Sequence, residues 1–206
     1  MSALDETMLL PSAQTPGISI SKEELAALPM QKFEGPIHFV ERDEDVGAAC
    51  EMLRGESLLG FDIETRPSFR VGESHPPALL QLAGSDAVFV FRLQKIRDAA
   101  PLLGLLSDVA ITKAGVALGD DLKKLRAVYS FEPAGFLDLG ILAREQGFKQ
   151  TGLRALAGLL LGFRISKKEQ RSNWAAPFLT RSQIAYAATD AWASREIYRK
   201  LASAGA

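Results

Sequence analysis

The alternation of apolar and polar positions along the chain predicts an α/β protein. Short apolar runs of strand length occur at residues 37–40, 58–63, 78–83, 87–91, 110–116 and 136–139. Segments with helical periodicity lie between or after them, at residues 43–53, 96–106, 119–128, 141–146, 153–161 and 181–201. The tripeptide Gly84-Ser85-Asp86 joins the third and fourth runs as a hairpin turn would. Strands first, with helices interleaved later, indicate an α/β domain with a mixed sheet.

Two of the expected helices begin with a capping signal. Ser21 is followed three residues later by Glu24, and Thr180 by Gln183, which is the capping-box pattern. Thr151 precedes the helix expected at residues 153–161, and we expect its hydroxyl to cap that helix.

Residues 1–35 differ from the rest of the chain because proline and glycine interrupt them at short intervals. The capping box at Ser21 lies inside this segment. We therefore expect a partly helical N-terminal extension at residues 1–35 and the main domain at residues 36–206.

Length and composition predict one soluble globular domain. The chain has 206 residues, of which 47% are hydrophobic, and a formal net charge of −1. Its apolar runs are far shorter than the roughly 20 residues that span a bilayer. The N-terminus does not show the basic region followed by an apolar stretch that is typical of a signal peptide. We therefore expect a cytoplasmic protein without a membrane partner. Cys50 is the single cysteine. It allows no internal disulfide or cysteine metal cluster, and its spacing from Val46, Ala49 and Leu53 predicts a core residue.

The charge is unevenly distributed. Residues 1–61 carry 4 basic and 11 acidic side chains, whereas residues 62–206 carry 20 basic and 14 acidic ones. Four of those 14 acids are the site candidates described next. If cations neutralise them, the rest of the segment is distinctly positive, which suits a polyanionic substrate held locally. The near-neutral total argues against extensive wrapping of a long duplex.

Asp62 and Glu64 form the first candidate constellation. They stand two residues apart at the end of an apolar run, so on a strand both carboxylates point to the same face. Two carboxylates held together repel unless a cation lies between them. A strand-end acid pair that faces water is an equally good explanation of this motif alone.

Asp121, Tyr186 and Asp190 are further candidates. Asp120 and Asp121 start a helix that one of them is expected to cap, which leaves the other available. Tyr186 and Asp190 stand four residues apart in an alanine-rich helical pattern and therefore share one helix face. The alternative is an ion pair between Asp190 and either Arg195 or Arg171.

The four acids together supply the oxygen ligands that hard divalent cations prefer. Mg²⁺ or Mn²⁺ fits such a set better than zinc, which favours nitrogen and sulfur. His38 lies in an apolar strand pattern and His75 in a loop pattern. Neither histidine has the spacing of a metal ligand, so we interpret both as structural.

Three motifs resemble those of the DEDD superfamily of 3′-to-5′ exonucleases. The segment Asp62-Ile63-Glu64-Thr65 resembles the first motif, and residues 115–125 resemble the second, in a register that selects Asp121 over Asp120. Residues 171–180 followed by Tyr186-Ala187-Ala188-Thr189-Asp190 are similar to the third motif with its lead-in. The tyrosine four residues before Asp190, with Ala185 where the sister branch has histidine, is typical of the DEDDy branch, which includes ribonuclease D and the Werner syndrome protein exonuclease domain.

The resemblance implies a ribonuclease H-like fold, with a five-stranded mixed sheet between helices and the acids gathered at one end. It also implies that Asp62, Glu64, Asp121 and Asp190 hold two divalent cations, Mg²⁺ or Mn²⁺, for hydrolysis of a phosphodiester bond at a 3′ end. Because an unperturbed phenol has a pKa of about 10, Tyr186 is expected to orient the attacking water rather than to deprotonate it.

Substrate contacts follow from the same resemblance. Thr65, Leu118, Asn173 and Trp174 are expected to meet the terminal nucleotide. Lys167, Lys168 and Arg171 form a basic cluster suited to phosphate, with a solvated loop as the equal alternative. Trp174 could stack on a base or pack under the last helix.

The implied partner is the 3′ end of a nucleic acid, single-stranded or short. The residues do not distinguish DNA from RNA, because the contact to a 2′-hydroxyl that would do so cannot be read from spacing. Self-association into a homo-oligomer stays open as a source of processivity. The competing hypothesis is a non-cleaving nucleic-acid-binding module on the same fold. Such a module is expected to lack one of the metal-ligating acids, and all four are present in this sequence.

Overall fold

The computed structural model describes residues 17–70 and 72–204. A mixed sheet of six strands forms its centre, in the spatial order β1-β4-β3-β2-β5-β6. Only β3 runs antiparallel to its neighbours β4 and β2, and the other three pairs are parallel. The strands are β1 (Ile37–Val40), β2 (Leu58–Thr65), β3 (Pro77–Ala83), β4 (Val88–Arg92), β5 (Thr112–Gly115) and β6 (Phe136–Asp138).

The α/β fold class and the predicted hairpin are confirmed, but the expected count of five strands is wrong. The sixth strand is β1, which pairs in parallel with β4 from Ile37 opposite Val88 to Val40 opposite Phe91. The apolar pattern had already indicated a strand there. Because β1 adds its backbone hydrogen bonds to the side of β4 that β3 leaves free, it covers an edge that would otherwise be open.

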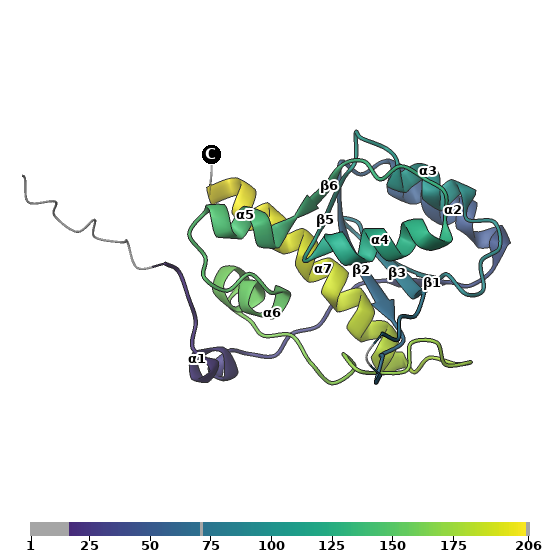
Figure 1. Ribbon diagram of the computed structural model, residues 1–206. Helices are drawn as coiled ribbons and strands as arrows, with labels where there is room; N and C mark the ends of the chain where they lie inside the picture. Colours follow the sequence, from purple (N-terminus) through teal and green to yellow (C-terminus); the bar gives the residue numbers. More distant parts are fainter. Residues whose placement is uncertain (1–16, 71, 205–206) are drawn as a thin grey trace, which may run out of the picture.

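Helices pack on both faces of the sheet, so that α4 and α7 lie on opposite sides of it (Figure 1). The first face is covered by α2 (Asp43–Arg54), α3 (Ala100–Leu106) and α4 (Leu118–Val128). The second face is covered by α7 (Arg181–Ala204), with α5 (Leu139–Glu145), α6 (Leu153–Leu156) and the π-helix η1 (Ala157–Leu161) packed beside it. Cys50 is buried in the first core, as predicted.

Helix α7 lies almost directly on β2. A Cβ atom placed on Gly60 would come within 1.9 Å of the Ala191 carbonyl oxygen, so no other side chain fits at this position. On the helix side, Ala187, Ala188 and Ala191 are fully buried. Small residues on both elements therefore bring the two backbones together, and with them the acids that flank Gly60 and Ala191 in sequence.

Side-chain hydrogen bonds explain where α3 begins. Helix α3 begins at Ala100 and not at Ile96 as predicted. The backbone N–H groups of Arg97 and Asp98 both donate to Asp43 Oδ1, at 2.6 and 3.2 Å, which holds these residues outside the helix. Asp98 Oδ1 in turn accepts the N–H of Ala100 at 3.1 Å.

Both capping boxes are confirmed. The N–H of Glu24 donates to Ser21 Oγ at 3.0 Å, and that of Gln183 donates to Thr180 Oγ1 at 3.1 Å. The reciprocal bonds to Glu24 and Gln183 are also present. The predicted cap by Thr151 is wrong, because Gly152 is the N-cap of α6 and no side chain bonds to that helix end.

The described part of the N-terminal extension packs against the domain. It contains α1 (Lys22–Ala27) and forms isolated parallel bridges from Ile18 to Phe148 and from Met30 to Arg164. Residues 1–16 of the predicted extension lie outside the described residues. Among the helices described, none combines the length and the apolar character needed to cross a bilayer.

Candidate active site

Strand β2 presents its acids to α7 and its apolar side chains to the other core. Phe61 and Ile63 are buried in the core that covers the first face. Because successive strand residues point to opposite faces, Asp62 and Glu64 point to the side of α7. Each of Asp62, Glu64 and Asp190 has a carboxylate oxygen within 4.8 Å of those of the other two.

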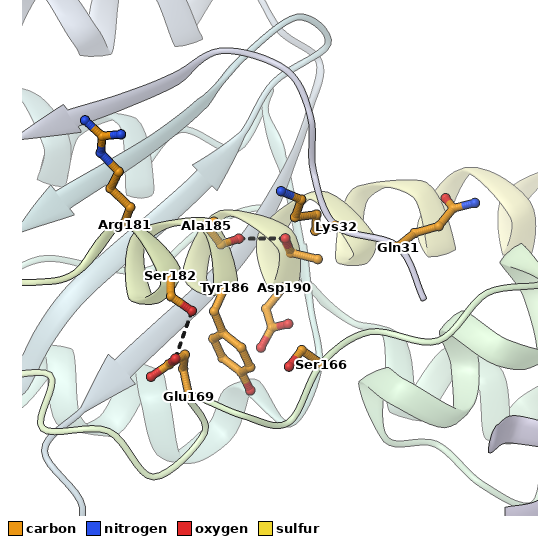
Figure 2. A pocket seen from close by; sticks show the side chains of 10 residues that line it. Gln31, Lys32, Ser166, Glu169, Arg181, Ser182, Ala185, Tyr186 and Asp190 are labelled. Atoms are coloured by element: carbon orange, nitrogen blue, oxygen red, sulfur yellow. Dashed lines mark hydrogen bonds between the residues drawn. The ribbon is translucent and has the colours of Figure 1, made fainter. Parts of the chain in front are cut away.

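Helix α7 carries Tyr186 and Asp190 on one face. The capping box at Thr180 fixes where the helix begins, and Figure 2 shows both side chains extending from the same side of α7 toward Ser166. Asp190 is only 7% exposed. The predicted spacing of four residues therefore brings the phenol and the carboxylate together at the cluster.

An ion pair with Arg195 or Arg171 does not occupy Asp190. Arg195 binds the Leu58 carbonyl and lies within 3.6 Å of Glu56, and Arg171 makes no ion pair among the described residues. The cation whose charge acts on Asp190 is Arg154. None of the described ion pairs involves Asp62, Glu64 or Asp190, so no cation of the described residues lies within ion-pair distance of the cluster.

Asp121 is in the first turn of α4 but caps nothing, so the predicted capping role of Asp120 or Asp121 is wrong. The N-cap of α4 is Ala117, in the left-handed region at φ 58°, and it offers no side-chain bond. The first N–H of the helix, from Leu118, donates instead to Asp138 Oδ2 at 2.9 Å. Asp121 is thereby left free, half-buried and outside the tight group of three acids.

Asp138 is a site-supporting residue that sequence reasoning missed. It ends β6, and its other oxygen, Oδ1, caps α5 through the N–H groups of Gly140 and Ile141 at 2.8 and 3.3 Å. One carboxylate therefore ties two helix starts together and fixes the entry of α4. An aspartate just before a helical segment was a usable N-cap signal for α5, but its second bond joins residues twenty apart in the chain.

Burial raises the pKa of every acid in the site. Burial first, and then the charges of Asp62 and Asp190, raise the pKa of Glu64 to about 10. Burial first, and then the charges of Asp190 and Asp121, raise the pKa of Asp62 well above its ordinary value. Burial also raises the pKa of Asp190 to about 7 and that of Asp121 to about 6. Without a cation, the ionised forms of these groups are disfavoured.

The Tyr186 hydroxyl keeps its proton at neutral pH. Burial, followed by the charges of Asp190 and Glu64, raises the pKa of Tyr186 above the ordinary phenol value. A protonated hydroxyl can donate one hydrogen bond and accept others. The group is therefore suited to orient a water molecule and poorly suited to remove a proton from one.

The donor set fits hard divalent cations. The three clustered acids and Asp121 offer only carboxylate oxygens, which Mg²⁺ and Mn²⁺ prefer. In the described ranges 17–70 and 72–204, this is the one group of three or more potential metal-ligating acids, histidines or cysteines. His38 stacks on Phe89 and does not belong to it.

The predicted substrate contacts are differently placed. Thr65 ends β2 after a bulge that follows Glu64. Leu118 is buried at the start of α4. Trp174 is fully buried, with its ring centroid 5.9 Å from that of Tyr186, so its indole packs under α7 and offers no face for a base. The remaining four candidates are exposed: Asn173, Lys167, Lys168 and Arg171.

Gln81 is a second residue that sequence reasoning missed. It stands directly opposite Asp62 in the antiparallel β2–β3 pair and is fully buried. Neither polar atom of its side-chain amide has a hydrogen-bond partner in the described part of the chain. Burying an amide that has no hydrogen-bond partner costs free energy of folding. Because residues directly opposite each other in a sheet share one face, the Gln81 amide lies beside the Asp62 carboxylate.

Known proteins resemble most of this chain. A family model described as "3'-5' exonuclease" matches residues 37–205. Ribonuclease D of Acidiphilium cryptum is 33% identical over 177 residues, covering 84% of this chain and 44% of that protein. The bifunctional 3′-5′ exonuclease/ATP-dependent helicase WRN of Mus musculus is 31% identical over 189 residues, covering 86% of this chain and 13% of that protein.

A solved structure resembles most of the fold. Escherichia coli RNase D superposes with a TM-score of 0.72 at 26% identity, over 82% of this chain and 46% of that one. The chain therefore spans less than half the length of these relatives.

Proposed function

The chain belongs to the 3′-5′ exonuclease family, a class of phosphodiester hydrolases, and on that premise we propose that it removes nucleotides from the 3′ end of DNA or RNA with two divalent cations. The products are nucleoside 5′-monophosphates. Residues 36–206 form the proposed exonuclease domain.

One observation carries the proposal: Asp62, Glu64 and Asp190 meet within 4.8 Å although β2 and α7 are far apart in sequence. The charges of the neighbouring acids raise the pKa values of Asp62 and Glu64, and no described ion pair relieves them. Cation binding explains why a buried site would keep all three. A non-cleaving binding module would have no need of the full acid set.

Each residue of the site has a proposed role. Asp62, Glu64, Asp121 and Asp190 hold Mg²⁺ or Mn²⁺, which when bound supply an acidified water and stabilise charge on the leaving oxygen. Tyr186 positions the attacking water through its protonated hydroxyl. Asp138 fixes the start of α4 and thereby the place of Asp121.

The substrate is proposed to be the 3′ end of a single or short strand. Relatives named Ribonuclease D favour RNA as the first substrate to test, and the WRN relative keeps DNA in the comparison. Thr65, Leu118 and Asn173 are proposed to contact the terminal nucleotide. Lys167 and Arg171 are proposed to contact phosphates, in line with their exposure.

Matched RNA and DNA strands labelled at the 5′ or the 3′ end, incubated with Mn²⁺ or Mg²⁺, test the proposal. We expect stepwise shortening from the 3′ end and loss of activity in Asp121→Asn. The matched control is Asp120→Asn, since this neighbouring acid is exposed and outside the site. Tight binding without shortening would instead favour the non-cleaving module.

A further inference from the structure

A cavity of about 400 Å³ opens beside the acid cluster (Figure 2). One end of it reaches Tyr186 and Asp190. The rest runs along the first turns of α7, between the segment that holds Gln31 and Lys32 and the loop from Ser166 to Glu169. We call it the α7 groove. It includes none of the four residues expected to meet the terminal nucleotide, so it is a separate surface next to the same acids.

The N-terminal extension forms one wall of the α7 groove and is held in place on both sides of Lys32. Before it, the N–H of Gln31 donates to the Arg164 carbonyl at 3.0 Å. After it, the N–H of Phe33 donates to Thr189 Oγ1 at 3.1 Å. Thr189 directly precedes Asp190, so the backbone around Lys32 is anchored to the helix turn that carries a site acid.

The opposite wall is also fixed. Glu169 accepts hydrogen bonds from the hydroxyls of Ser172, at 2.6 Å, and Ser182, at 2.9 Å, which join the loop to the first turn of α7 (Figure 2). These bonds also lower the pKa of Glu169, so that it keeps its negative charge. Each of its two carboxylate oxygens accepts a hydrogen bond from one of these hydroxyls, so the carboxylate is held against its own loop and the start of α7.

Two cations line the α7 groove and are available to a ligand. Lys32 approaches Glu34 at 3.6 Å, but both side chains are largely exposed, so this pair is weak. Arg181 takes part in none of the ion pairs between residues 17 and 204 that the structure describes. The hydroxyl group of Ser166, which accepts a hydrogen bond from the Lys168 N–H and keeps its own proton to donate, lines the same space. Cations with hydroxyls along a groove are the usual contacts of a phosphodiester backbone.

We propose that the α7 groove binds the phosphodiester backbone of the substrate strand next to the cleaved bond, with Lys32 and Arg181 each contacting a phosphate. The residues around Lys32 lie outside the matched family region, which begins at residue 37, and the proposal makes them part of this chain's substrate site. The inference rests on the proposed function, because it takes the acid cluster as the place of cleavage.

Steady-state kinetics on a short single strand test the proposal with Lys32→Ala and Arg181→Ala. Each variant is expected to raise KM about three- to tenfold, to leave kcat within about twofold, and to lower the slope of log KM against log salt by about 0.7. Lys22→Ala is the matched control, since it removes an exposed charge from the same extension at α1, and its kinetics should equal those of the unaltered chain. A dinucleotide, whose single phosphate is the one cleaved, should be processed equally by all variants.

Equal KM values for Lys32→Ala, Arg181→Ala and Lys22→Ala would overturn the inference, as would a fall in kcat with no change in KM. Failure of the proposed function looks different, because the unaltered chain would then show no turnover. In that case, fluorescence anisotropy with the same strand still tests the groove. Weaker binding by Lys32→Ala than by Lys22→Ala would support it, and equal binding would overturn it.

Discussion

The two faces of strand β2 carry opposite kinds of side chain. Phe61 and Ile63 point into the core under α2, α3 and α4 and are at most 7% exposed. Asp62 and Glu64 point toward α7, where Gly60 and the alanines of the helix bring the backbones together. Burial of the apolar face stabilises the strand by about 1.5–3 kcal/mol per side chain, whereas burial of the acids raises their pKa values and lowers stability.

The difference shows how one strand can be stabilised on its apolar face while its other face buries carboxylates at a cost in free energy. The apolar face fixes the position of β2, and the same pleat then delivers two carboxylates to a fixed place on the other side. Small residues on α7 allow Asp190 to approach within 4.8 Å of them. Repulsion among the acids is what a bound cation would relieve, so the proposed metal-dependent function and a lower stability without metal would have the same origin.

The largest effect is expected on the apolar face. Phe61→Ala should lower the free energy of unfolding by about 3–5 kcal/mol, because it leaves a cavity where the fully buried ring packs edge-on against Phe136. Urea unfolding measures this loss. The same loss should occur with and without Mn²⁺. A loss of under about 1 kcal/mol would mean that this face does not hold the strand.

The pH dependence of the metal-free protein gives the next largest effect. The pKa of Asp190 is about 7 in the folded chain, above the ordinary value of about 4, so the folded state binds the extra proton between these values. The unfolding free energy should therefore be highest below about pH 4 for this group and fall as pH rises toward 7, by about 2–3 kcal/mol between pH 5 and 7. Chemical denaturation in EDTA at several pH values measures it, and saturating Mn²⁺ should suppress the fall. A stability that rises over this range would contradict the assignment.

The difference between the two faces of β2 could largely be predicted from the sequence, because it depends on the local spacing of residues. The alternation in residues 58–65 placed Asp62 and Glu64 on one face, and the spacing of Tyr186 and Asp190 placed both on one helix side. Contacts between distant segments could not be predicted in this way. The double cap by Asp138, the orphaned amide of Gln81 and the anchoring of residues 31–33 on α7 all depend on tertiary neighbours.

The predictions for the start of α3 and the cap of α4 were wrong because contacts with distant residues decide them. The helical periodicity from Ile96 onward suggested an early start for α3, but Asp43, more than fifty residues away, holds the Arg97 and Asp98 amides in another arrangement. The paired acids at the start of α4 looked like a cap by composition, and a carboxylate from β6 took that role. In both cases a remote aspartate outcompetes the local signal.

A smaller effect on stability is expected from removal of one acid. Asp62→Asn should raise the metal-free free energy of unfolding at about pH 8 by about 1–2 kcal/mol, since burial raises the pKa of the Asp62 carboxyl so that it must take up a proton on folding at this pH, which the amide need not. Thermal or urea unfolding in EDTA measures the gain. Asp120→Asn, on an exposed acid, should stay within about 0.5 kcal/mol of the unaltered chain. Loss of stability in Asp62→Asn would show that this carboxylate supports the fold.

The most direct test of the central claim, that β2 and α7 gather their acids to bind divalent cations, is calorimetric titration of the metal-free chain with Mn²⁺ at about pH 7.5. We predict saturable binding of two ions per chain, loss of at least one of them in Asp190→Asn, and an unchanged isotherm in Asp120→Asn. An absence of saturable binding, or the same isotherm in Asp190→Asn as in the unaltered chain, would contradict it.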